Sequence, residues 1–400
     1  MNEKKIIFFN NDSKKENKKI VIFGAGIVAK KCIENLNKSK ILFIVDNNKK
    51  LWGSSFEGIN IYDPNKLRKI DKKNILVVIT TTSFVDVMRQ LEKINYKLQR
   101  SVSYYLKDRI HIEVLQNLKK KILISSGLPP INKKNSGGGL YEIDLKGISW
   151  NIKKVYSGTV HGVIKFKDGY AISDSVNGII LLDKNYKILK KGTYPNNTRA
   201  HGIAFDNKRK LFYIVCSNTD QVKVFDLKLE LKKSILISKK YKKFKSPQHH
   251  INDICIKDGY LYVSMFSLSG NHKRNIYDGG VCKISPKNSK IVKKIYGDLL
   301  MPHSIKYINK SFMILDSLRG NFVIGEKKVA SFPGFSRGLS FDGKYFFIGQ
   351  SRNRNFSMIN NSKDNISIDN SILIYDYKNK SSRSLYLPNT ISEIHEVLVL

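Results

Sequence analysis

The feature that most constrains the fold of this chain is a motif that recurs six times within residues 121–400. In each copy a histidine or arginine opens a short apolar stretch, and in the first five copies a second apolar stretch follows after a turn. The six basic residues are His161, His201, His250, His303, Arg337 and His395, separated by 40, 49, 53, 34 and 58 residues. These intervals are typical of the four-stranded blades of a β-propeller. The repeat therefore predicts an all-β ring of blades, in which each basic residue opens an innermost strand.

The sixth copy of the motif is followed by a single strand, because the sequence ends five residues after His395. Strands that could complete this blade are found at residues 121–126, 138–145 and 152–156. We therefore expect the C-terminal strand to close a blade that residues 121–156 begin. This closure gives a six-bladed β-propeller over residues 121–400 and removes open sheet edges.

Residues 17–105 show a different pattern, in which buried strands alternate with helices, and they predict an α/β domain of the Rossmann-like class. A strand over residues 19–24 leads into the turn G-A-G-I-V-A, the GxGxxA variant of the dinucleotide-binding fingerprint. Gly24 would allow the tight turn, Gly26 would let the backbone approach a phosphate, and Ala29 would permit close packing of helix on strand. Asp46 ends the next strand, where its carboxylate could accept ribose hydroxyls. The turn thus predicts a bound nucleotide.

This region also resembles a small Rossmann-like domain that is often attached to glycan-modifying bacterial enzymes. The likeness rests on the glycine turn, on Asp46-Asn47, on G-x-x-F-x-G-x-x-I at residues 53–61 and on Pro-x-x-Leu at residues 64–67. It implies binding of a nucleotide or nucleotide-sugar. About 85 residues leave no room for the catalytic half of a dehydrogenase, and the alternative is a degenerate domain that serves only as a scaffold. Residues 106–120, whose apolar positions have helical spacing, are expected to form a connecting helix.

The innermost strands of a propeller line its central channel, so the six basic residues of the repeat are expected around one opening. We take all six as candidate catalytic or ligand-binding residues. Protonated imidazoles would repel one another, which favours a metal, an anion or depressed pKa values. Neutral imidazoles suit a divalent transition metal, with His201, His250 and His303 as ligands. The alternative is a structural histidine that bonds to the neighbouring blade in each repeat.

Two further residue types refine this hypothesis. Carboxylates at Asp174 or Asp316, which follow second strands of the repeat, could orient the imidazoles. Arg337 favours a substrate that carries a carboxylate, phosphate or sulfate. No nucleophile–base pair or pair of catalytic carboxylates is recognisable in the sequence, so the reaction type stays open.

Residues 300–304, 315–317, 332–339 and 348–352 carry a second resemblance. Their sequences, L-M-P-H-S, L-D-S, F-P-G-F-S-R-G-L and I-G-Q-S-R, resemble an uncharacterised bacterial propeller family, the domain of unknown function 4915. The likeness covers residues 121–400 and implies the fold. It implies no activity, because none is established for the family.

The net charge of +38 first suggests nucleic acid or an anionic membrane as a partner. The lysines are spread over both halves of the chain beside abundant asparagine, without a long basic tail, so we expect no nucleic-acid partner. No apolar segment is long enough for a signal peptide or a membrane span. The four cysteines are scattered singly, which is typical of a reduced, cytoplasmic protein.

Two classes of function therefore stand open. The first is an enzyme or binding protein that acts on a small anionic ligand, a sugar or a nucleotide-sugar in surface-glycan metabolism. The second is a non-catalytic interaction module, in which the propeller is a platform and the N-terminal domain a scaffold.

Overall fold

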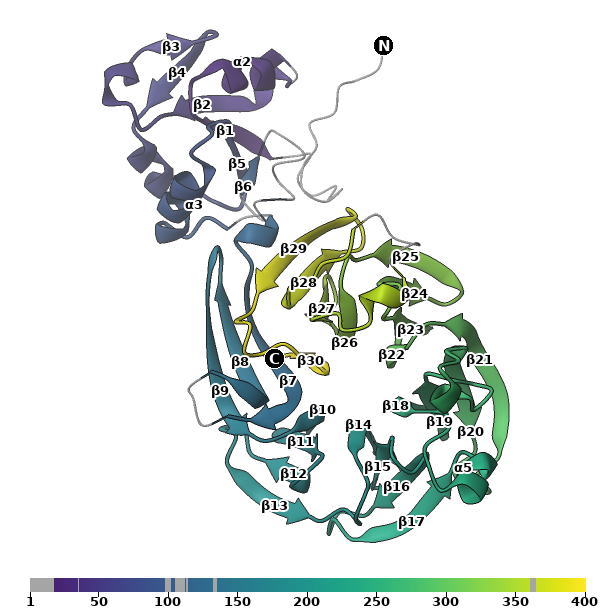
Figure 1. Cartoon of the computed structure of the whole chain (residues 1–400). Helices are drawn as coiled ribbons and strands as arrows, with labels where there is room; N and C mark the ends of the chain where they lie inside the picture. The colour runs from purple at the N-terminus through teal and green to yellow at the C-terminus, as the bar shows by residue number, and fades with distance from the viewer. Residues whose placement is uncertain are drawn as a thin grey trace. The chain divides into compact units, whose positions relative to one another are not determined.

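The computed structural model describes residues 18–34, 36–97, 102–104, 112, 114–131, 135–359 and 365–400. The chain divides into two compact units, Met1–Asn117 and Leu118–Leu400. Figure 1 labels the strands and α-helices of both units. No helix in the described parts of the chain combines the length and hydropathy that a membrane span requires.

The first unit contains a mixed six-stranded sheet in the order β3-β4-β2-β1-β5-β6. The strands are β1 (Lys19–Phe23), β2 (Ile41–Val45), β3 (Ser55–Phe56), β4 (Ile59–Tyr62), β5 (Ile75–Ile79) and β6 (Val102–Tyr104). All neighbouring pairs are parallel except β3 and β4. Its helices include α2 (Ile27–Glu34), α3 (Phe84–Lys93) and the short 3-10 turns η1 (Lys38–Lys40), η2 (Lys49–Leu51) and η3 (Pro64–Lys69).

The sequence pattern explains these elements. The central strands β1 and β5 are apolar and buried along almost their whole length, because helices or loops cover both faces of a parallel sheet. Helix α3 buries Phe84, Val87, Met88 and Leu91, which recur at helical spacing on one face. The strands expected at residues 19–24, 41–45 and 75–80 are confirmed. Of the expected connecting helix, residues 106–111 and 113 lie outside the described residues. Residues 114–116 are helical, and β7 begins at Lys119 rather than at residue 121.

The second unit is a ring of six four-stranded antiparallel sheets, which confirms the predicted blades (Figure 1). The first blade has β10 (Val160–Phe166), β11 (Gly169–Asp174), β12 (Gly178–Leu182) and β13 (Ile188–Gly192); the second has β14 (Ala200–Asp206), β15 (Leu211–Cys216), β16 (Gln221–Phe225) and β17 (Leu231–Leu236). The third has β18 (Ile251–Lys257), β19 (Tyr260–Met265), β20 (Gly279–Ile284) and β21 (Ile291–Leu299); the fourth has β22 (His303–Ile308), β23 (Ser311–Asp316), β24 (Asn321–Ile324) and β25 (Lys327–Ser331). The fifth has β26 (Phe335–Phe341), β27 (Phe346–Ser351), β28 (Ser371–Asp376) and β29 (Ser381–Tyr386). Outside the sheets lie α5 (Lys239–Phe244), η4 (His272–Arg274) and η5 (Phe356–Met358).

The sixth blade is the predicted closure. Its strands are β30 (Glu396–Val399), β7 (Lys119–Pro130), β8 (Gly137–Lys146) and β9 (Ser149–Ser157), in that order from the ring centre outward. Strand β30 pairs antiparallel with β7, from Glu396 opposite Ser125 to Val399 opposite Ile122. The sheet thus joins residues almost 280 positions apart in the sequence, and it leaves no inner strand without a neighbour.

Glycines follow several of the repeated basic residues because the inner strands approach closely at the ring centre. A Cβ added at Gly162 would lie 2.9 Å from the carbonyl oxygen of His201, and one added at Gly202 would lie 2.4 Å from Asp253 Oδ1. Gly338 also has a φ of +75°, which favours glycine. The His-Gly and Arg-Gly pairs in the sequence therefore mark the places where one blade touches the next.

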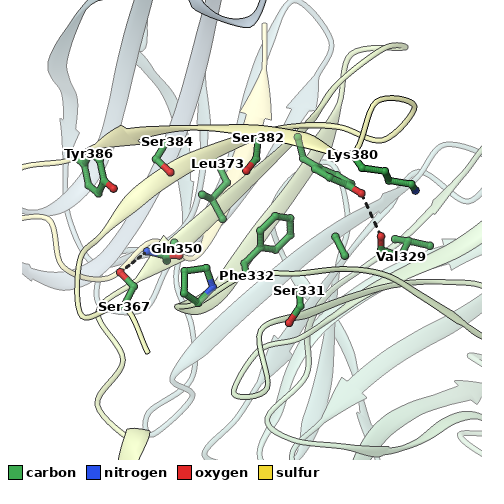
Figure 2. A pocket seen from close by; sticks show the side chains of 13 residues that line it. Val329, Ser331, Phe332, Gln350, Ser367, Leu373, Lys380, Ser382, Ser384 and Tyr386 are labelled. Carbon is green, nitrogen blue, oxygen red and sulfur yellow. Dashed lines mark hydrogen bonds between the residues drawn. The ribbon is translucent and has the colours of Figure 1, made fainter. Parts of the chain in front are cut away.

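A surface pocket lies between the outer strands of the fourth and fifth blades (Figure 2). Phe332, Leu373 and Tyr375 form part of its apolar wall, and the Gln350 amide donates from Nε2 to Ser367 Oγ at 3.2 Å. None of the six repeated basic residues lines this pocket.

Candidate functional site

The register of the blades decides which residues reach the ring centre. His161 and His201 are each the second residue of their inner strands, β10 and β14. Strand β18 pairs with the second strand of its blade in the same register as β10 and β14 do. Its second residue, Asn252, therefore takes the position that His161 and His201 have in their blades. His250 precedes β18 and has a left-handed backbone with a φ of 49°. The prediction that every repeated basic residue opens an inner strand is therefore wrong for His250, and His395 also directly precedes its strand, β30 (Glu396–Val399).

Asn252 has the structural role at this position of the third blade. Its Nδ2 donates to the carbonyl oxygen of Pro302 at 2.8 Å, and its Oδ1 accepts from Ser264 Oγ at 2.5 Å. The amide side chain thus holds the third and fourth blades together, and His250 reaches the opening from the preceding loop.

Side-chain rings form a closed circuit around the opening. The ring centroids of His161, His201, His250, Phe266, His303 and Phe335 follow one another at 4.4, 6.0, 4.3, 5.3 and 5.6 Å. The Arg337 guanidinium lies 4.7 Å from the centroid of Phe335, and its Nη1 lies 3.2 Å from His395 Nε2. The His395 ring returns to His161 at 4.2 Å. The circuit contains all six predicted residues together with two phenylalanines.

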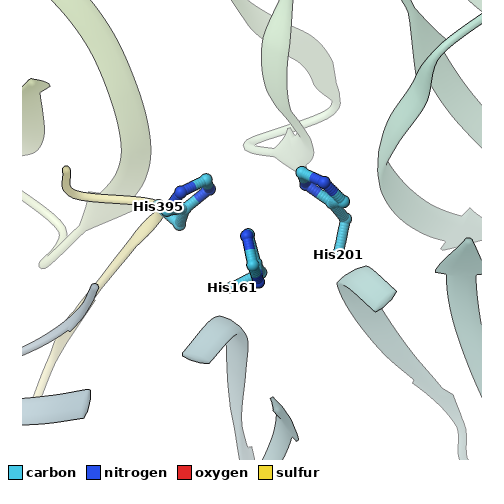
Figure 3. A group of neighbouring side chains, drawn as sticks. All are labelled: His161, His201 and His395. Carbon is cyan, nitrogen blue, oxygen red and sulfur yellow. The ribbon is translucent and has the colours of Figure 1, made fainter. Parts of the chain in front are cut away.

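His161, His201 and His395 form the tightest part of the circuit (Figure 3). One ring nitrogen from each lies within 4.8 Å of the others. His161 and His201 are 7% and 5% exposed. The predicted metal ligands His201, His250 and His303 are arranged differently, because the Phe266 ring stacks on His250 and separates it from His303. Only His201 belongs to both sets.

Serines, rather than carboxylates, orient two of the histidines. Ser175 Oγ lies 2.8 Å from His161 Nδ1, and Ser317 Oγ lies 2.9 Å from His303 Nδ1. Asp174 accepts the Tyr156 hydroxyl at 2.9 Å, and Asp316 accepts the backbone N–H of Leu300 at 2.7 Å. Both carboxylates therefore hold blade ends, and the expectation that they orient imidazoles is corrected.

The opening is electrostatically positive. Burial first, and then neighbouring charged groups, lower the pKa of the five ring histidines well below its usual value. Burial also lowers the pKa of Arg337 to about 10, although Glu393 opposes this shift. The charges of Arg199, Arg337 and Arg354 all act on His395 in the same direction. The imidazoles are therefore neutral at physiological pH, and the positive charge resides on the arginines.

Glu393 provides negative charge at the opening. Its Oε1 pairs with Arg354 Nη1 at 2.6 Å, and its Oε2 lies 3.3 Å from His395 Nε2 and 3.8 Å from Arg337 Nη1. One carboxylate therefore faces two guanidinium groups and an imidazole.

The glycine turn of the first unit lies between β1 and α2. Gly24 has a φ of +103°, Ala29 is fully buried, and a Cβ added at Gly26 would meet nothing within 4 Å. The Asp46 carboxylate accepts two backbone N–H groups at 2.8 Å, from Ala25 and from Asn48. Asp46 thus stabilises the turn itself, and Gly26 leaves open space in front of α2.

The comparisons with known proteins address the family. Residues 144–400 match the model of a domain of unknown function, DUF4915. The chain belongs to the DUF4915 family. Residues 16–102 of this DUF4915 protein match a second model, described as "C2185-like, N-terminal". No curated protein matches the chain.

Among solved structures, two proteins are similar to this DUF4915 chain. One is described as a nidogen/laminin complex, with 10% identity and a TM-score of 0.49, covering 70% of this chain and 98% of its own. The other is a protein of unknown function from Bacteroides caccae, with 13% identity and a TM-score of 0.49, covering 71% of this chain and 99% of its own.

The sequence pattern of this DUF4915 protein does not indicate several residues of the opening. Phe266 and Ser175 both come directly after the second strand of a blade, so alignment of second-strand ends would have found them. Glu393 and His272 come from loops outside the repeat. The His272 ring lies 4.8 Å from the His250 ring.

Proposed function

We propose that the propeller opening binds a small anionic ligand, such as the phosphate or carboxylate group of a sugar or nucleotide-sugar. The observation that carries the proposal is the imbalance of charge around the buried circuit. Besides burial, Arg337, Arg199 and Arg354 all lower the pKa of His395, whereas one carboxylate, Glu393, contacts His395, Arg337 and Arg354. An anion in the opening would relieve this imbalance.

Arg337 supports the proposal most directly. It is 8% exposed, and its Nε is buried without a hydrogen-bond partner among the described residues. Its Nη1 lies 3.8 Å from Glu393, too far for a hydrogen bond. A guanidinium that is buried and incompletely bonded is suited to a bidentate carboxylate or phosphate. Phe266 and Phe335 add apolar faces on which a sugar ring could stack.

The first unit supports a nucleotide-linked ligand. We propose that it is a Rossmann-like domain, with residues 17–105 as its extent, and that its glycine turn holds a phosphate at the start of α2. The parallel order β4-β2-β1-β5-β6 and the open space at Gly26 favour this function. A role in surface-glycan metabolism, by catalysis or by binding, would unite the two units.

The second candidate is a non-catalytic interaction module. The buried serine bonds to His161 and His303 favour it, because they also fit histidines that only pack blades together. Binding measurements separate the two candidates, since a packing role requires no small ligand.

Arg337→Gln is expected to weaken phosphate and hexose-phosphate binding by about 10-fold or more, because a charge-assisted hydrogen bond contributes about 1.5–3 kcal/mol. Isothermal titration of the full chain with each anion measures this. Arg89→Gln, which removes an equal charge from a side chain 64% exposed on the first unit, should bind as wild type does. A wild type that binds neither phosphate nor any hexose phosphate would favour the interaction module.

Gly26→Asp is expected to abolish nucleotide binding by the first unit, because a carboxylate would fill the open space and repel a phosphate. Equilibrium binding of a fluorescent nucleotide to the full chain measures this. Ser55→Asp, which adds the same charge at an exposed position on β3, serves as the control. If wild type binds no nucleotide or nucleotide-sugar, the scaffold hypothesis holds.

A further inference from the structure

We infer that His161, His201 and His395 form a three-histidine site for a divalent transition metal. The inference deepens the proposed function and rests on the same opening, where the ion would hold the anion that Arg337 faces. Four observations carry it: the spacing of the nitrogens, an unpartnered nitrogen, a fixed tautomer and a space kept open by glycine.

The spacing comes from three neighbouring blades. His161 lies on β10 and His201 on β14, while His395 directly precedes β30, and their ring nitrogens lie within 4.8 Å of one another. Nitrogens about 2.1 Å from a tetrahedral ion would lie about 3.4 Å apart, so loading closes the largest separation by about 1.4 Å.

His201 supplies an unpartnered nitrogen. Its Nε2 is buried and has no hydrogen-bond partner among the described residues. His201 is 5% exposed, and its ring lies 4.4 Å from that of His161. Buried ring nitrogens normally find a partner. A metal ion between the rings would be that partner.

Ser175 fixes the tautomer of His161. Ser175 Oγ lies 2.7 Å from the carbonyl oxygen of Ala200, which can only accept, so the hydroxyl donates its hydrogen there. The same Oγ must then accept from His161 Nδ1–H at 2.8 Å. The lone pair of His161 therefore resides on Nε2, the nitrogen that points away from Ser175. This arrangement is the usual outer-shell support of a metal-binding imidazole.

Gly127 keeps the space beside the nitrogens open. Ser175 in the first blade and Ser317 in the fourth lie beside the histidine of their blade. The pairing of β30 with β7 gives Gly127 the equivalent position in the sixth blade. A Cβ added at Gly127 would lie 2.6 Å from Nε2 of His161 and 2.6 Å from Nε2 of His395. A serine here would fill the space between two of the three ligands.

The charged groups around the three histidines suit a metal ion that also binds an anion. Three neutral imidazoles leave one coordination position open on a tetrahedral ion. Arg337 Nη1 donates to His395 Nε2 at 3.2 Å, and a metal ion on that nitrogen would take the lone pair and free the guanidinium to face the anion. Glu393, at 3.3 Å from the same nitrogen, offsets part of the added positive charge. Imidazole ligands select Zn²⁺ and its transition-metal neighbours over Mg²⁺ or Ca²⁺.

The test is metal titration of the full chain after treatment with a chelator. Co²⁺ reports its coordination through visible absorption, and Zn²⁺ is measured by competition with a chromophoric chelator. We expect one ion per chain. His201→Ala should lower its affinity by at least about 100-fold, since even outer-shell partners contribute about 10- to 100-fold. His303→Ala, another buried ring histidine outside the trio, should leave the affinity unchanged.

Ser175→Ala and Gly127→Ser keep the test decisive if His201→Ala fails to fold. Both leave all three ligands in place, and both should weaken binding by about 10-fold or more. A wild type that binds neither ion, a His201→Ala variant that binds as wild type does, or an equal loss in His303→Ala would overturn the inference. Phosphate titration of the same proteins keeps the two proposals apart. Phosphate binding without metal binding overturns only the metal site, and metal binding without anion binding overturns only the proposed function.

Discussion

A chain that ends after His395 is expected to lose the cooperative unfolding transition of the propeller. The deletion removes β30, the inner strand of the closing blade, which pairs with β7 and packs beside β10 and β26. Glu396 and Val397 are 5% and 1% exposed. Each buried aliphatic side chain contributes about 1.5–3 kcal/mol, and the deletion also exposes unpaired edges on β7. Val397 is buried, Leu398, Val399 and Leu400 are partly buried, and their loss is a large share of the stability of about 5–15 kcal/mol that is typical of a domain.

Thermal unfolding followed by circular dichroism measures this effect, and limited proteolysis locates it in the propeller. Leu400→Ala is the matched control, because it keeps the backbone bond from Leu400 N–H to the carbonyl oxygen of Lys121 and shortens only a partly buried side chain. The control should unfold cooperatively at a slightly lower temperature. A deletion variant that unfolds as sharply and as late as wild type would show that closure is not what holds the ring.

Lys306→Met is expected to lower the free energy of unfolding by about 3 kcal/mol. Lys306 Nζ lies 2.6 Å from Glu396 Oε2, and the two side chains are 25% and 7% exposed. Burial alone would lower the pKa of Lys306, but Glu396 and Asp253 raise it. Burial, and then Glu396, raise the pKa of Asp253 to about 7, while Lys306 lowers it. Without the ammonium group, two buried carboxyl groups face one another uncompensated.

Urea unfolding monitored by fluorescence gives the free energies to compare. Lys165→Met replaces an exposed lysine on inner strand β10 and should change stability by less than about 0.5 kcal/mol. Lys306→Met combined with Glu396→Gln should recover part of the loss, because it removes one of the two charges. If Lys306→Met is as stable as wild type, the partial exposure of Lys306 already screens the pair.

The blades were predictable because each repeat carries its own strands and turns in contiguous sequence. The ring closure was predictable because one strand remained at the end and three lacked a partner at the start. The sequence repeat misplaced His250, since counting residues cannot distinguish an inner strand from the loop before it. The strand register, which gives the position to Asn252, depends on pairing with β19.

The candidate metal ligands show a different limit. The predicted ligands, His201, His250 and His303, are consecutive in the sequence repeat. In a closed ring, however, the first and last basic residues of the repeat are also neighbours. Closure itself implies that His395 lies beside His161. The intervening ring of Phe266 was not predictable from the motif, because it comes from the end of a second strand. The tautomer of His161 depends on Ser175 and Ala200, whose arrangement exists only in the folded ring.

The position of His395 directly before β30 makes the histidine cluster sensitive to how far folding has advanced. During synthesis, His161 and His201 emerge almost 200 residues before their third partner, and that partner reaches them only when β30 pairs with β7. An open ring brings together two of the three imidazoles, whereas a closed ring brings together all three. Any ligand that needs all three imidazoles would therefore bind only rings whose last blade is complete. By mass action, such a ligand would stabilise the closed ring against separation of β30 from β7.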